Sequence, residues 1–139
     1  FKDGRPRVID YLGLPFNYGM IPQTVQSAES GGDGDPLDVI VLGEAIPRGR
    51  VIQVRVLGVI EMLDGGLRDD KIIAAPVESM MGQLSGLGDL NRHYPGVMDI
   101  CRTWLINYKK GGKISVKETG DENRALKIIM QSVDQFSNQ

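Results

Sequence analysis

Residues 51–63 (VIQVRVLGVIEML) constrain the fold more than any other stretch of the chain. They are rich in β-branched side chains and partly alternate between apolar and polar positions, a pattern typical of a long β-strand. Gly58 within this run predicts a bulge or a bend. Shorter apolar runs at 39–42 and 71–75 predict two further strands. The first half of the chain is therefore expected to form a sheet.

Helical periodicity replaces this pattern in the second half. Apolar side chains recur at helical spacing over residues 97–109 and again over 121–136, where Asp121 is expected to be the N-cap. The apolar residues expected on one face of the second helix are Ala125, Leu126, Ile129, Val133 and Phe136. Residues 113–119, between the two helices, predict one more strand. Strands first and helices last predict an α+β fold, in which helices pack against a small twisted barrel or sheet.

Composition limits the class of protein. The chain has 139 residues, 41% hydrophobic and 24% charged, as expected for a single globular domain over 1–139. Cys101 is the only cysteine, which excludes an internal disulfide and a cysteine-based zinc site. The net charge of −2 argues against broad nucleic-acid binding. No stretch approaches the roughly 20 apolar residues that a membrane span requires.

Residues 33–38 (DGDPLD) hold three carboxylates in a loop that leads into a predicted strand. Clustered oxygen ligands suit hard cations such as Mg²⁺ or Mn²⁺, whereas a solvated acidic turn is the competing interpretation. An EF-hand calcium loop is excluded, because Leu37 would occupy its fifth position and Asp38 would occupy the sixth, where glycine is needed. Metal binding is the favoured function of this loop, and the solvated turn stays open.

A second acidic group surrounds the Gly65-Gly66 turn after the long strand. Its carboxylates are Asp64, Asp69 and Asp70, and Lys71 begins the next strand. Alone this is an ordinary hairpin with charged edges, but two acidic loops at neighbouring strand ends could converge on more than one metal, a device used in phosphoryl chemistry. Candidate phosphate donors are Arg7, residues 17–19, Lys71, Tyr108 and Lys109. Each of these, taken singly, also fits an ordinary surface or packing role.

Four ordered blocks resemble the family I soluble inorganic pyrophosphatases. Residues 33–39 (DGDPLDV) match the short diagnostic motif of that family. Residues 16–24 (FNYGMIPQT) resemble its upstream block, residues 59–76 resemble the next one, and Tyr108-Lys109 resembles a Tyr-Lys pair at the end of its first helix. The resemblance covers about the whole chain, and four blocks in order are far more specific than any one alone.

The resemblance implies a role for each matched residue. Asp33, Asp38 and Asp69 would hold a first metal, Asp38 would bridge to a second, and Asp64 with Asp69 would serve metals that arrive with the substrate. Asp35 would be the general base and Tyr18 would orient the site. The implied phosphate ligands are Arg7, Lys71, Tyr108 and Lys109. The implied reaction is hydrolysis of pyrophosphate to two phosphates by a metal-activated water, with several Mg²⁺ ions per site and Mn²⁺ as a possible substitute.

The resemblance also sets expectations beyond the site. It implies a five-stranded OB-like barrel with two main helices, a homo-oligomer (a hexamer), pyrophosphate as the substrate, and no nucleic-acid or membrane partner. The expected compartment is the cytoplasm, or the periplasm if an N-terminal signal precedes the chain. There are departures: the family's upstream Lys and Glu residues have no match, Leu14 and Gly65 replace its usual tyrosine and acidic residue, and Arg5 competes with Arg7 as the phosphate ligand. A metal- or nucleic-acid-binding module without catalysis and a phosphohydrolase acting on nucleotides are the alternatives.

Overall fold

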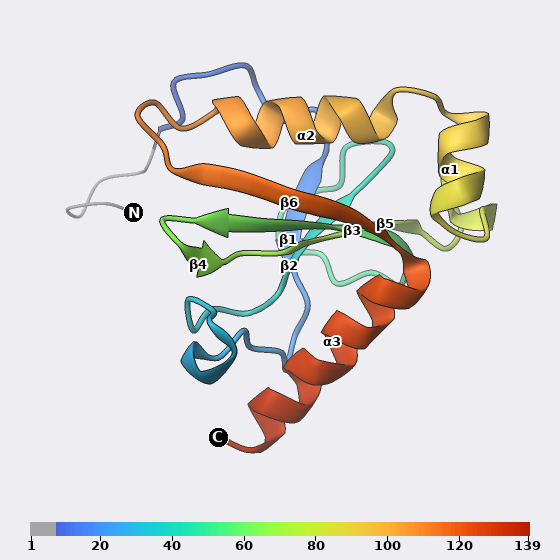
Figure 1. The fold of residues 1–139 in the computed structure, drawn as a ribbon. Coiled ribbons are helices and arrows are strands. Elements are labelled where there is room, and N and C mark those ends of the chain that lie inside the picture. The colour runs from blue at the N-terminus through green and yellow to red at the C-terminus, as the bar shows by residue number, and fades with distance from the viewer. Residues whose placement is uncertain (1–7) are drawn as a thin grey trace.

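The computed structural model describes residues 8–139, and in it a mixed sheet lies between helices (Figure 1). The strands are β1 (Asn17–Met20), β2 (Asp38–Val41), β3 (Val54–Asp64), β4 (Leu67–Arg68), β5 (Lys71–Pro76) and β6 (Ile114–Asp121). The α-helices are α1 (Leu87–His93), α2 (Val97–Asn107) and α3 (Glu122–Ser137), and two 3₁₀ turns span Ala28–Ser30 and Met81–Gln83. Within the described residues no helix is long and apolar enough to cross a membrane.

The strand order is β1-β2-β5-β3, with β6 on the far side of β3. Strands β4 and β5 both pair with β3 and are separated only by residues 69–70, so they act as one interrupted strand and leave five strand positions. The β2–β5 pair is parallel and the other pairs are antiparallel. No pairing between β1 and β6 closes the sheet within residues 8–139. The α+β architecture predicted from the sequence is confirmed.

The long strand carries the predicted irregularity at Gly58. The register between β3 and β5 shifts between Val56 and Gly58. A Cβ atom at Gly58 would lie 2.9 Å from the carbonyl oxygen of Gly120 in β6. Glycine is therefore needed where the backbones of β3 and β6 approach each other most closely.

Both faces of the sheet are buried, each in its own apolar cluster. Ile40, Ile60 and Ile73 pack with α1 and α2 on one face. Val39 and Ile72, one position along in the same strands, pack with α3 on the other face. Figure 1 shows α2 running along one side of the sheet and α3 along the other. A sheet covered on both faces explains why β2 and β5 are continuous apolar runs without alternation.

Helix α3 begins as predicted, but its buried face differs from the expected one. The side chain of Asp121 accepts a hydrogen bond from the backbone N–H of Arg124 at 2.9 Å, which confirms the N-cap. The buried residues are Ala125, Ile128 and Ser132. Leu126, Val133 and Phe136 are 39–47% exposed, so only part of the predicted apolar face packs on the sheet.

The loop before the acidic motif explains this difference. The backbone N–H of Val25 donates to the carbonyl of Ser132 at 3.1 Å, and the N–H of Ser27 donates to the side chain of Gln135 at 3.2 Å. These contacts dock residues 25–27 on the second half of α3 and select the small Ser132 for the interface. Apolar periodicity alone carries no information about such a contact.

Candidate functional site

Strand register brings the first acidic loop to the second. In the parallel β2–β5 pair, Asp38 lies directly opposite Lys71, at the first residue of both strands. The next residues on the same face are Ile40 and Ile73, which belong to the cluster under α2. Tyr18 of β1 pairs with Ile40. The predicted site residues therefore stand at one end of an apolar row, where three strands meet.

The centre of the site is the ammonium group of Lys71. Its Nζ donates to the hydroxyl of Tyr18 at 2.7 Å, to Oδ2 of Asp38 at 2.6 Å and to Oδ1 of Asp69 at 2.9 Å. The Lys71 side chain is 3% exposed, so these charge-assisted bonds are shielded from water. All three ammonium protons are thus used within the protein.

Burial dominates the electrostatics of this cluster. It raises the pKa of Asp69, even though Lys71 beside it favours the ionised carboxylate. It also raises the pKa of Tyr18, which stays a neutral hydroxyl. For Lys71 burial opposes the charge, but Tyr18 and Asp38 outweigh it and raise the pKa above its ordinary value. Lys71 is therefore a permanent cation under physiological conditions.

A second ion pair joins the end of β3 to the residue pair that follows α2. Nζ of Lys109 lies 2.5 Å from Oδ2 of Asp64, and both side chains are partly buried. The neighbouring Tyr108 stacks on Trp104 with ring centroids 4.6 Å apart. Tyr108 and Tyr18 also line one small pocket of about 210 Å³, together with Trp104 and Leu105. Packing on the core thus fixes Tyr108 close to Tyr18.

The first acidic loop is a turn. Oδ1 of Asp33 accepts the backbone N–H of Asp35 at 3.0 Å, and Gly34 between them has a φ of 82°, in the left-handed region that favours glycine. Both carboxylates are exposed. Within residues 8–139 no hydrogen bond or ion pair links Asp33 or Asp35 to Asp38, Asp64 or Asp69.

The predicted metal ligands fall into separate positions in this structure. No group of three or more His, Cys, Asp or Glu side chains among residues 8–139 is arranged to hold a metal ion as it stands. The metal assignment to Asp33, Asp38, Asp64 and Asp69 therefore stays a prediction. The donors do fit a hard cation chemically, because all are carboxylate oxygens and two of them already share the ammonium of Lys71. Arg7 and its alternative Arg5 lie outside the described residues.

Sequence reasoning missed one buried polar pair behind the site. Gln26 is 4% exposed and Asp70 is 2% exposed, and their side chains are hydrogen-bonded to each other. Strand alternation offered a signal for Asp70: Asp69 and Lys71 point to one side, so the carboxylate between them points to the other and needs its own partners. No local pattern marks Gln26.

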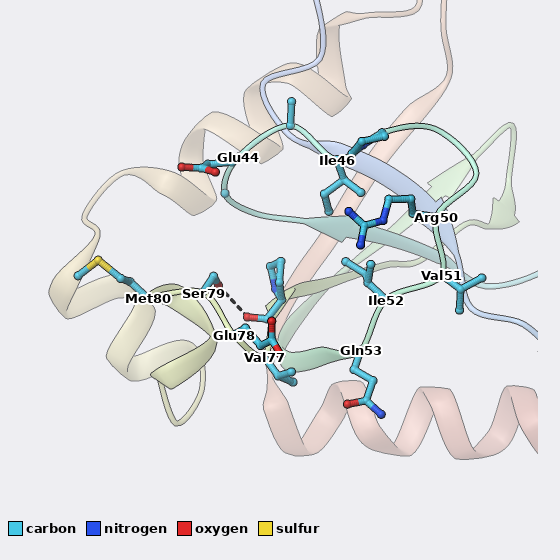
Figure 2. A pocket seen from close by; sticks show the side chains of 14 residues that line it. Glu44, Ile46, Arg50, Val51, Ile52, Gln53, Val77, Glu78, Ser79 and Met80 are labelled. Carbon is cyan, nitrogen blue, oxygen red and sulfur yellow. Dashed lines mark hydrogen bonds between the residues drawn. The ribbon is translucent and has the colours of Figure 1, made fainter.

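A large hollow lies away from these residues. It has a volume of about 880 Å³ and is lined by residues 43–47, 50–53 and 76–80, as Figure 2 shows. Two of these segments lie at the ends of β2 and β5 and the third leads into β3, whereas Asp38 and Lys71 begin β2 and β5. The hollow is therefore at the opposite end of the two strands, and among residues 8–139 none of the predicted site residues lines it.

Comparison with known proteins identifies a family. A family model described as inorganic pyrophosphatase matches residues 4–137. The inorganic pyrophosphatase of Bos taurus is 34% identical in an alignment 152 residues long. The alignment covers 96% of this chain and 53% of that protein. The recombinant inorganic pyrophosphatase from T brucei brucei has a TM-score of 0.91 at 30% identity, covering 99% of this chain and 44% of its own.

A third comparison adds a ligand. The N-terminal domain truncated vacuolar soluble pyrophosphatase of Trypanosoma cruzi, solved in complex with PPi, has a TM-score of 0.89 at 29% identity, covering 99% of this chain and 58% of that one. The chain thus spans about half the length of the relatives it matches. The match itself runs through almost all of the residues printed here. The chain belongs to the inorganic pyrophosphatase family.

Proposed function

We propose that this chain hydrolyses inorganic pyrophosphate to two orthophosphates, with Mg²⁺ as its cofactor. The observation that carries the proposal is the buried Lys71 ammonium between Asp38 and Asp69. The two carboxylates stabilise a positive charge at this point. Tyr108 and Lys109, the further proposed hydrogen-bond donors to phosphate, lie on the segment after α2. The PPi complex of the Trypanosoma cruzi relative supports the choice of substrate.

The carboxylates would hold the cation. Asp38 and Asp69 would form the core of the metal site, and Asp33 and Asp64 complete the proposed ligand set. Mg²⁺, when bound, supplies neutralisation of the substrate's negative charge and lowers the pKa of a water molecule. A cation bound there would compete with the Lys71 ammonium for the carboxylates of Asp38 and Asp69.

Asp35 is the proposed general base. It is exposed on a turn, and its backbone is fixed on both sides: its N–H donates to Asp33 and its carbonyl accepts from the N–H of Gln26 at 3.0 Å. The carboxylate would take a proton from the attacking water as the new P–O bond forms and the bridging P–O bond breaks. A positioned base of this kind contributes about 10²–10⁴-fold to the rate.

The cationic and hydroxyl groups would bind the two phosphoryl groups. Lys109 offers a point charge to phosphate oxygens and Arg7 offers a bidentate guanidinium. Tyr108 offers a hydroxyl donor. Lys71 offsets charge on the leaving phosphate. Tyr18 would act on Lys71 through its hydroxyl, which accepts one ammonium proton.

Assembly and location extend the proposal. We propose a homo-oligomer, a hexamer by resemblance to the family, and the exposed Leu126, Met130 and Phe136 on α3 support a covered apolar surface. Light scattering after size-exclusion chromatography tests it, and a monomer would contradict it. The cytoplasm is the proposed compartment because biosynthesis releases pyrophosphate there, and cell fractionation tests that assignment.

The test of the activity is phosphate release from pyrophosphate, with and without Mg²⁺, with ATP and a sugar phosphate as control substrates. We expect fast release from pyrophosphate only when Mg²⁺ is present. Arg50→Ala, in the distant hollow, is the matched control and should keep wild-type turnover. Release that ignores Mg²⁺, or that is equally fast from ATP, contradicts the proposal.

A further inference from the structure

A buried carboxylate lies directly behind the candidate site. Asp70 lies between Asp69 and Lys71 in the chain, and its carboxylate is not among the hydrogen-bond acceptors of the Lys71 ammonium. Its Oδ1 accepts the backbone N–H of Met62 at 3.3 Å, and its Oδ2 accepts from Gln26 at 2.9 Å and from Arg68 at 2.6 Å. At 2% exposure, a carboxylate needs such donors to be tolerated.

Gln26 connects this carboxylate to the loop that carries Asp33 and Asp35. Its side-chain Nε2 donates to Asp70, and its Oε1 accepts the backbone N–H of Asp70 at 3.2 Å. Its backbone carbonyl accepts from Gly34 at 2.8 Å, and its backbone N–H donates to Asp35 at 3.0 Å. All of its polar groups are therefore used, half of them on each acidic loop.

A second link runs parallel to the first. The backbone N–H of Arg68 donates to the carbonyl of Gly31 at 2.8 Å, and Arg68 forms a β-bridge with Gly32. A Cβ atom at Gly32 would lie 2.3 Å from the carbonyl oxygen of Gln26, so the backbones pack too closely for any other residue. Arg68 thus joins the same two loops through its backbone while its side chain neutralises Asp70.

We propose that Gln26 and Asp70 are positioning residues that hold the loop of Asp33 and Asp35 in register with the segment of Asp69 and Lys71. The inference rests on the proposed function. Carboxylates on separate loops repel one another, so a cation that must gather them binds weakly unless the backbone fixes their spacing. The amide–carboxylate pair supplies that spacing from behind the site and uses no side-chain oxygen of the proposed metal ligands.

The test is direct binding of Mg²⁺ by isothermal titration calorimetry, with no substrate present. Gln26→Met keeps the length and burial of the side chain and removes both of its hydrogen bonds. Asp70→Asn is the second, milder variant. Loss of a group that orients metal ligands typically weakens metal affinity about 10- to 100-fold, and we expect a loss of roughly 10-fold for Gln26→Met. Raised Mg²⁺ concentration should recover turnover in Gln26→Met but not in Asp35→Asn.

Ile128→Val is the matched control. It removes one methyl group from the cluster under α3 and lowers stability without removing any hydrogen bond of Gln26 or Asp70. If Gln26→Met and Asp70→Asn lower the melting temperature as Ile128→Val does but bind Mg²⁺ with wild-type affinity, the positioning role is overturned and the proposed function stands. If the unsubstituted chain neither binds Mg²⁺ nor releases phosphate from pyrophosphate, both are overturned.

Discussion

Replacing Lys71 by methionine is the most informative single change in this molecule. Lys71→Met keeps the volume of the side chain and removes its charge. Asp38 and Asp69 would then face each other without the cation that both now contact. In the absence of metal the variant should therefore be less stable than the wild type, although no apolar contact has been lost.

The structure sets the size of this effect. Removing one member of a buried ion pair costs about 3–5 kcal/mol, because the remaining charge stays buried and unpaired. The Lys71 side chain is 3% exposed, but Asp38 is 24% and Asp69 is 15% exposed, so water reaches both carboxylates. We expect the lower end, about 3 kcal/mol. The total free energy of unfolding of a domain of this kind is only about 5–15 kcal/mol.

Mg²⁺ should reverse most of that loss. Without the competing ammonium the two carboxylates bind a divalent cation more tightly, and a ligand present at about 100 times its Kd adds roughly 2.7 kcal/mol of stability. The same variant should hydrolyse pyrophosphate more slowly, since the proposed phosphate donor is gone. Tighter metal binding with slower turnover is an unusual combination that a general packing defect would not produce.

Urea unfolding in EDTA and in Mg²⁺, followed by the fluorescence of Trp104, measures both effects. Trp104 is the only tryptophan and packs in the core beside the site. Lys110→Met is the matched control, because Lys110 pairs with Asp10 on the surface and both side chains are at least 73% exposed. Equal stability of Lys71→Met and wild type in EDTA, or equal stabilisation of the two by Mg²⁺, would refute the reasoning.

Three further predictions address other groups. Asp35→Asn should lower kcat by at least about 10²-fold and leave the urea midpoint unchanged; turnover within a few-fold of wild type removes Asp35 as the base. Lys109→Ala should raise KM for pyrophosphate roughly 10-fold with a stability change below about 1 kcal/mol, because its pair with Asp64 is partly solvated; unchanged kinetics remove Lys109 from the site. Burial raises the pKa of Cys101 to about 11. The folded state thus keeps a proton that the unfolded chain loses first. Stability should therefore fall by about 1 kcal/mol more in wild type than in Cys101→Ala between pH 8 and pH 10, and parallel urea midpoints would contradict the assignment.

The regular elements were predictable where local pattern and tertiary burial agree. The long strand, its bulge at Gly58 and the helix at α2 all follow from periodicity and glycine placement. Strand β1 and helix α1 were missed because their partners are remote. Asn17 fixes β1 through side-chain bonds to the backbone of Val41, Glu44 and Ile46. Helix α1 starts where Glu122 accepts the N–H of Leu87, a contact across 35 residues.

The residue types of the candidate site were predictable, but their pairing was not. Sequence pattern identified Asp38, Asp69 and Lys71, yet it assigned Lys71 to phosphate only. The contact between Lys71 and Asp38 depends on the parallel register of β2 and β5, which separate stretches of chain create together. Local spacing contains no information about that register.

The number of N–H donors on Lys71 links its hydrogen bonds to Asp38 and Asp69 with its proposed role in binding phosphate. An ammonium group has three protons, and Tyr18, Asp38 and Asp69 accept all of them in this structure. Lys71 can donate to a phosphate oxygen only by giving up one of these partners, at the cost of leaving a buried acceptor unpaired. A cation bound by Asp38 and Asp69 would satisfy those two carboxylates. Two N–H groups of Lys71 would then be available to donate hydrogen bonds to the substrate. If Asp38 and Asp69 hold a cation as proposed, cation binding and phosphate binding at Lys71 would be coupled through these hydrogen bonds, because Lys71 would then leave no buried carboxylate unpaired when it donates to phosphate.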